Sequence, residues 1–199
     1  MKNIRTFHKT LLIKSFITVI LVSISNYCLS QKPDDSKEVA NKQNDILYAN
    51  IPKANEARFL VDVSEINQIE IKLGVLAQKK GISKDVKNLG KMMESLHVSC
   101  NEELIELASK EAINLPKSLT DNSIEVINKL SNLSDSFFDK EYCDLMVNGY
   151  KAAIAEFDNE IKDSNDTEIK QFTTTTVLVM KSHLLYAIAC QNKCKIAEK

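Results

Sequence analysis

The sequence has no tryptophan and few of the residues that break helices. Its 199 residues include only four glycines and three prolines, and aromatic residues make up 6% of the chain. Glycine and proline are the strongest signals of turns, and a fold of many short strands needs turns at regular intervals. Their scarcity therefore argues against a strand-and-turn fold and favours long helices.

The sequence also lacks an excess of basic charge. It holds 26 Lys and Arg residues against 27 Asp and Glu residues, and its net charge is −1. Residues 31–199 contain 22 of the basic residues and all 27 acidic ones, so this part carries a net charge of −5. No basic stripe is left to neutralise phosphates, which argues against nucleic acid as a partner.

Residues 1–30 have the pattern of a secretory signal peptide. Four basic residues and no acidic one precede an apolar run over 16–24, which is short for a membrane span, and small residues precede Gln31. We expect cleavage after Ser30 and an exported protein, in the periplasm or on the outer surface of the cell envelope, with no stable membrane span. Without cleavage the segment would anchor the protein in the membrane.

The remaining chain divides into a polar linker and one domain. Residues 31–52 are rich in Lys, Asp and Asn, which is typical of a flexible tether. In residues 53–195, apolar side chains recur at helical spacing over four long segments, about 53–80, 84–111, 136–161 and 167–190. The pattern predicts an all-α fold, a ferritin-like up-down four-helix bundle.

Caps and connections complete this prediction. We expect a short connecting helix over 120–132, between the second and third long helices and across one end of the bundle. Ser83 is the expected N-cap of the second helix. Ser136 with Asp139, and the segment 165–168, predict capping boxes for the third and fourth helices.

Three ionisable residues fall on the apolar faces of long helices, each near the middle of its helix. They are Glu70, His97 and His183. A buried ionisable group is costly unless it is paired, hydrogen bonded or bound to a metal. A di-iron site in a bundle takes Glu from two helices and Glu-x-x-His from the other two, and Glu94 with His97 forms one such motif. This level of the bundle is therefore the candidate functional site.

The ligand set is incomplete, which leaves two hypotheses. Tyr150 stands near the middle of the third helix, and the fourth has no carboxylate three residues before His183. In the leading hypothesis the histidines are core residues hydrogen bonded to Glu70 and Tyr150, and no cofactor is bound. In the alternative, a degenerate site holds a transition metal such as iron or zinc. Its ligands would be Glu70, Glu94, His97 and His183.

Four cysteines follow the expected cleavage point: Cys100, Cys143, Cys190 and Cys194. An even number in an exported protein permits disulfides. The first three occupy small apolar positions within helices, so we favour buried free thiols and keep one bridge as the alternative. A bridge between Cys190 and Cys194 is disfavoured because parallel side chains on one helix face do not meet disulfide geometry.

Several segments together resemble the DUF4142 family, in order over about residues 53 to 190. The matching segments are 59–61, 69–77, 86–97, 101–104, 115–116, 138–142, 145–147 and 183–184. The resemblance implies an exported bacterial protein with a ferritin-like four-helix fold. It implies no activity, because the biochemical role of the family is undefined.

The chain departs from the family pattern at the candidate site. Members of the family typically carry Asp-His in the second and third helices and His in the fourth. Here the corresponding residues are Leu96-His97, Gly149-Tyr150 and His183, so only Glu70, His97 and His183 carry over. No phosphate loop, nucleophile–base pair or dinucleotide fingerprint predicts catalysis. We therefore expect a non-catalytic binding or structural module, with an envelope protein as one candidate partner, and a metal-binding or redox protein as the alternative.

Overall fold

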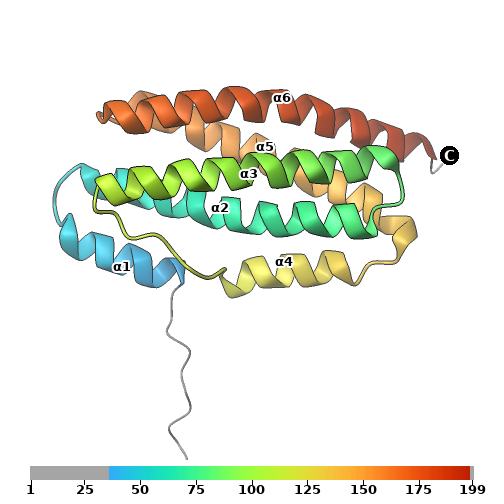
Figure 1. Cartoon of the computed structure of the whole chain (residues 1–199), viewed down its shortest axis with the longest axis horizontal. Coiled ribbons are helices and arrows are strands. Elements are labelled where there is room, and N and C mark those ends of the chain that lie inside the picture. The colour runs from blue at the N-terminus through green and yellow to red at the C-terminus, as the bar shows by residue number, and fades with distance from the viewer. Residues whose placement is uncertain (1–35, 198–199) are drawn as a thin grey trace, which may run out of the picture. The chain divides into compact units, whose positions relative to one another are not determined.

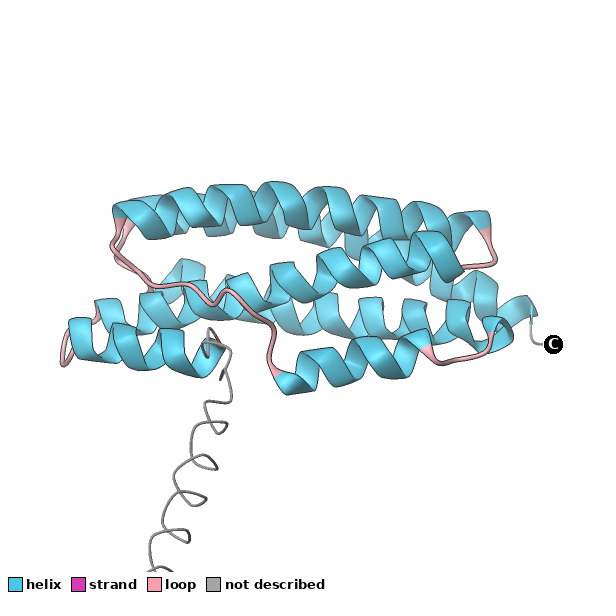
Figure 2. Ribbon diagram, turned by 60° about the horizontal axis from the view of Figure 1, so that its bottom comes forward, coloured by secondary structure: helices cyan, strands magenta, loops and turns pink. Residues whose placement is uncertain are grey.

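Residues 36–197 are described by the computed structural model, and all regular structure in this range is helical (Figures 1 and 2). There are no strands in the described residues. The helices are α1 (Lys37–Leu47), α2 (Lys53–Lys80), α3 (Lys84–Lys110), α4 (Asp121–Ser131), α5 (Asp135–Asp163) and α6 (Thr167–Ala197). The expected signal peptide and its cleavage point lie outside the described residues.

The four long helices form two antiparallel hairpins, α2 with α3 and α5 with α6, which pack together around one core (Figure 1). Large side chains from all four helices are fully buried there, which confirms the predicted all-α bundle. The largest are Leu60, Leu73, Leu89, Met93, Leu104, Phe138, Tyr142, Met146, Phe157, Ile169 and Met180. None of the helices in 36–197 is both long enough and apolar enough to cross a membrane.

The connection between the hairpins runs along the bundle, so the prediction of a helix across one end is wrong (Figure 2). At the start of α4, Thr120 donates to Glu65 in the middle of α2. At its end, Lys80 of α2 donates to the carbonyl of Ser131. The chain thus returns lengthwise along α2, and α5 begins beside the start of α3. The ferritin-like assignment of this arrangement stays a prediction.

Part of the segment predicted as a polar linker is instead helix α1, which packs against α2. The side chain of Asn44 is buried and forms two hydrogen bonds with the backbone of Asn114, at 2.9 and 2.8 Å. The other buried residue of α1 is Ala40. Because this buried face is small and partly polar, it gives no apolar stripe that a search for periodicity could detect.

One predicted helix cap is confirmed, and the residues at the starts of α5 and α6 differ from the predicted capping boxes. Ser83 accepts from the backbone of Val86, as predicted. Helix α5 begins at Asp135, before the predicted cap Ser136, and Asp139 instead accepts from the backbone of Ile82 and Ser83. The carboxylate of Asp139 therefore holds the turn between α2 and α3. At α6, Asp166 caps the helix by accepting from the backbone N–H groups of residues 168 and 169.

Helices α2 and α3 touch backbone to backbone at Gly74 and Gly90. A Cβ added to Gly90 would lie 2.7 Å from the carbonyl oxygen of Gly74 and 2.8 Å from Cβ of Ala77. Backbone atoms cannot move aside cheaply, so the two helices would have to separate. This contact fixes the register of the first hairpin, from which Glu70 and His97 face the core.

We expect Gly90→Ala to lower the free energy of unfolding by about 1–3 kcal/mol, the usual cost of overpacking. Urea denaturation followed by circular dichroism measures it. Gly149→Ala is the matched control, because a Cβ there would meet only the carboxylate of Glu70, at 3.5 Å. Alanine also favours the helix over glycine. If both variants lost stability equally, the backbone contact would not be the cause.

Candidate functional site

A group of polar side chains lies within the core at the middle of the bundle. We call it the central polar cluster, and its members are Glu70, His97, Tyr142, Tyr150 and His183. They come from α2, α3, α5, α5 and α6, so all four long helices contribute. Tyr142 and Tyr150 belong to the hydrophobic core and His97 is buried, whereas Glu70 and His183 are partly exposed. The cluster contains the three residues predicted from helix midpoints and two tyrosines.

Tyr150 is the centre of the cluster. Its hydroxyl lies 2.9 Å from Sδ of Met93 and 3.1 Å from Nδ1 of His183. A hydroxyl has one proton, so it can donate to the sulfur and accept from His183 at the same time only if Nδ1 of His183 carries a proton. The Tyr150 ring also stacks beside the ring of His97, with centroids 6.4 Å apart. The predicted pairing of His183 with Tyr150 is therefore present.

His97 bonds to a partner that the sequence did not predict. Its Nδ1 lies 2.9 Å from Oδ1 of Asn67, and the Asn67 amide in turn donates to Sγ of Cys100 at 3.5 Å. Burial, with a smaller contribution from His183, lowers the pKa of His97 to about 3. The ring is therefore neutral, and because Nδ1–H donates to Oδ1 of Asn67, Nε2 presents a lone pair to the core. Asn67 lies three residues before Glu70, at the spacing of one helix face.

Glu70 is partly exposed as a residue, but Oε2 of its carboxyl is buried, and this burial raises the pKa of Glu70 to about 8. The carboxyl is therefore protonated at neutral pH. Three buried polar atoms of the cluster have no hydrogen-bond partner among the described residues: Oε2 of Glu70, Nε2 of His97 and the hydroxyl of Tyr142. Such atoms are usually hydrogen bonded to buried water or to a ligand. At neutral pH the cluster is thus an uncharged set of donors and acceptors.

The four candidate ligands do not fit a shared metal ion. The carboxylate of Glu94 accepts a hydrogen bond from the side-chain amide of Gln78, at 2.5 Å. The side chain of Tyr150 contacts both histidine rings. Within residues 36–197, no three His, Cys, Asp or Glu side chains are grouped so that they could hold a metal. A metal bound at Glu70, Glu94, His97 and His183 stays a prediction.

Two hollows lie along the seam between α3 and α6, which we call the groove, and His183 of the cluster lines the first of them. The first hollow, which we call the neutral hollow, has a volume of about 660 Å³. His183 lines it while its Nδ1 bonds to Tyr150 inside the core. The full lining is Asn88, Lys91, Met92, Ser95, Leu96, Ser99, Val179, His183 and Tyr186. Among residues 36–197, no acidic side chain lines this hollow, and Lys91 is the one lysine or arginine in its lining.

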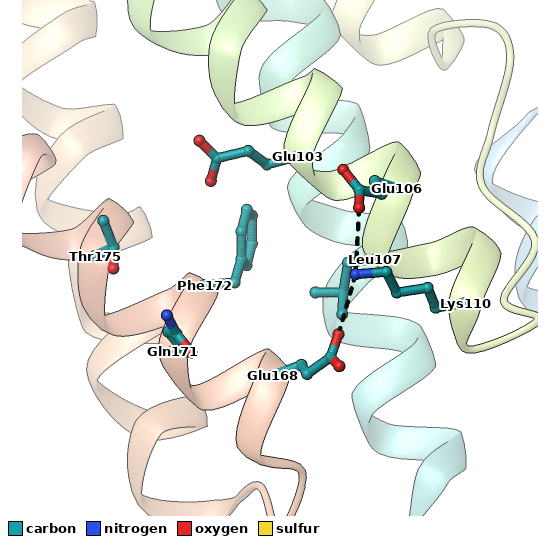
Figure 3. A pocket seen from close by; sticks show the side chains of 8 residues that line it. All are labelled: Glu103, Glu106, Leu107, Lys110, Glu168, Gln171, Phe172 and Thr175. Carbon is teal, nitrogen blue, oxygen red and sulfur yellow. Dashed lines mark ion pairs between the residues drawn. The ribbon is translucent and has the colours of Figure 1, made fainter.

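The second hollow of the groove, which we call the acidic hollow, is negatively charged (Figure 3). Its volume is about 470 Å³, and three glutamates line it. Lys110 pairs with Glu106 at 3.2 Å and with Glu168 at 3.6 Å, which leaves Glu103 as an additional negative charge. Figure 3 shows Leu107 and Phe172 at the base between the two helices. The groove therefore changes from neutral or weakly basic to acidic along its length.

Comparison with known proteins identifies one family. The model described as "Domain of unknown function (DUF4142)" matches residues 48–189. Neither the comparison with curated proteins nor that with solved structures finds a match. The matched range begins just after α1 and ends within α6, and it contains the whole central polar cluster and the groove.

Proposed function

The chain belongs to the DUF4142 family, and we propose that it is a non-catalytic binding module of the cell envelope that takes a small amphipathic ligand in the neutral hollow. Its place in the envelope rests on the signal-peptide pattern of residues 1–30. The observation that carries the binding role is the neutral hollow itself. Its volume lies within the range of small-molecule sites, about 300–1,000 Å³.

The lining of the neutral hollow favours a ligand with an apolar body and an acidic group. Met92, Leu96, Val179 and Tyr186 supply apolar surface, and the side chain of Val179 is 38% exposed. Lys91 offers a positive charge, and serine and asparagine side chains offer hydrogen bonds. An anionic ligand would be repelled by the glutamates of the acidic hollow, so we expect it to bind only in the neutral one.

His183 gives this hollow a fixed polar group. Its Nδ1 is used by Tyr150, so Nε2 is the nitrogen left to meet a ligand. Burial lowers the pKa of His183, so the ring is neutral at neutral pH. With the proton on Nδ1, Nε2 accepts a hydrogen bond. A ligand with a hydroxyl or amide donor beside its apolar body therefore fits this position.

The probe for this proposal is 8-anilinonaphthalene-1-sulfonate, which joins an apolar body to an anionic group. We expect saturable binding of one probe per chain to protein purified from cells that express the full chain. Ser99→Trp should fill the neutral hollow and weaken binding at least about tenfold, which corresponds to about 1.4 kcal/mol. The chain has no other tryptophan, so the new side chain also reports the probe by fluorescence quenching.

Thr175→Trp is the matched control, because it places the same side chain in the acidic hollow. It should leave probe binding unchanged. Lys91→Gln should weaken binding of the sulfonate a few-fold, in line with an exposed charge pair. It should not weaken binding of the uncharged probe N-phenyl-1-naphthylamine. Equal losses in both tryptophan variants, or no saturable binding by protein with a native melting curve, would exclude this site.

A further inference from the structure

Three cysteines meet between α5 and α6, about two helical turns beyond His183 along α6, and Cys143 directly follows Tyr142 of the central polar cluster. Cys143 of α5 is fully buried in the same core cluster as Cys190 of α6, Cys194 packs against that cluster, and the thiols of both α6 cysteines raise the pKa of Cys143. Cys190 and Cys194 are one helical turn apart, so both face the same point on α5. All three are free thiols, Cys190 is buried and Cys194 is partly exposed.

The neighbouring residues fix this juxtaposition. Gln191 donates to Asp144 at 2.6 Å, so the residues that follow Cys190 and Cys143 also face each other across the two helices. Ala187, one turn before Cys190, is fully buried and allows α5 and α6 to approach closely. Lys193 pairs with Asp85 of α3 at 2.6 Å, which places the end of α6 beside the start of α3.

We propose that Cys143, Cys190 and Cys194 form a redox site, in which Cys143 makes a disulfide with either cysteine of α6. We call the three residues the thiol triad. The sulfur of Cys143 is shared, because a direct bridge between Cys190 and Cys194 would join parallel side chains on one helix face. Cys100 lies outside the triad, since its neighbour is Asn67.

The oxidant is a disulfide compound, such as glutathione disulfide or a thiol–disulfide oxidoreductase, and the reaction has two steps. The Cys194 thiolate attacks one sulfur of the oxidant, forms a mixed disulfide and releases one thiol. The Cys143 thiolate then attacks Sγ of Cys194 and releases the second thiol. The two protein protons end on the two released thiols, and the oxidant takes up the two electrons.

The bridge can then move within the triad. The Cys190 thiolate attacks Sγ of Cys143, which transfers the bridge to Cys143–Cys190 and frees Cys194. The interaction with Cys143 lowers the pKa of Cys190, which favours the thiolate at this position, whereas burial raises the pKa of Cys194 and the interaction with Cys190 raises that of Cys143. Cys194 is the partly exposed member, so it controls how fast an oxidant reaches the triad.

Native protein purified from cells that express the full chain should be reduced, incubated with glutathione disulfide and analysed by peptide mass spectrometry. We expect a loss of about 2 Da from the chain, and peptides that link Cys143 to Cys190 or Cys194. Cys143→Ala should abolish the linked peptides. Cys190→Ala and Cys194→Ala should each keep one bridge, and the double variant should keep none.

Cys194→Ala should also slow oxidation by on the order of tenfold or more, because the remaining sulfurs are buried. Cys100→Ala is the matched control and should behave as the wild type. All variants are compared by circular dichroism, so that only folded protein is scored. A bridge that persists in folded Cys143→Ala, or a wild type that stays fully reduced under native conditions, would overturn the proposal.

Discussion

Glu70→Gln should raise the free energy of unfolding by about 3 kcal/mol at pH 7. The folded pKa of Glu70 is about 8 because the carboxyl is buried, whereas the ordinary value is 4.5. Between these values the folded protein keeps a proton that the unfolded chain has lost, so stability falls as pH rises through this window. Each pH unit costs about 1.4 kcal/mol, and pH 7 lies 2.5 units above the ordinary pKa. Glutamine cannot ionise and avoids this loss.

Urea denaturation at several values between pH 5 and pH 9 measures the effect. The difference between Glu70→Gln and wild type should grow from pH 5 to about pH 8 and then level off. Glu160→Gln is the control, because burial raises the pKa of Glu160 to about 7, with help from Glu56 and Asp163. The shift there is smaller and the side chain less buried, so the gain should be smaller. A difference that does not change with pH would mean that Glu70 is ionised in the folded protein.

His97→Gln should have a similar effect at acid pH, with an increase of about 3 kcal/mol at pH 4. The folded pKa of His97 is about 3, mainly because of burial, and the ordinary value is 6.5. Below 6.5 the unfolded chain binds a proton that the folded protein does not, so stability falls as pH drops toward 3. The glutamine amide can still donate to Asn67, so the variant should lose little at neutral pH.

An acid titration followed by circular dichroism tests this expectation. The midpoint of acid unfolding should move to lower pH in His97→Gln. His183→Gln is the matched control, because burial lowers the pKa of His183 as well, but this ring is only half buried. Its effect should be smaller. If the acid midpoint of His97→Gln equalled that of the wild type, other groups would control acid unfolding.

The two effects have opposite signs and overlap between about pH 4.5 and 6.5. In that window the loss from Glu70 as pH rises balances the gain from His97. We therefore expect these two groups to give a broad maximum of stability in this range, with a decline on either side. The double variant Glu70→Gln/His97→Gln should have a flatter profile than either single variant.

Much of the fold could be predicted from the sequence, because long helices carry their core in a repeating apolar stripe. The same stripe placed Glu70, His97 and His183 at one level, and in the structure all three belong to the central polar cluster. The missed features depend on tertiary neighbours. Nothing local indicates that Asn67 binds His97, or that Glu94 turns to Gln78.

Two errors in the fold have the same origin. Helix α1 is stabilised by Asn44, whose partner Asn114 lies 70 residues away, so its own composition still resembles a linker. The lengthwise course of α4 depends on Glu65 accepting from Thr120, and only a contact between distant segments could show it. The convergence of Cys143 with both α6 cysteines depends in turn on the register between α5 and α6, which no motif specifies.

The position of α1 determines how the domain would respond to mechanical load. A force applied at Ser36 acts first on α1, which is outside the four-helix core and is held by the hydrogen bonds of Asn44 with Asn114 and by the surface pairs Lys37–Asp62 and Arg58–Asp45. Exposed pairs of this kind contribute little stability. Helix α1 would therefore detach before the core is strained, and in doing so would lengthen the chain between the core and whatever holds its N-terminal end. We therefore expect the four-helix bundle to stay folded at forces that already release α1.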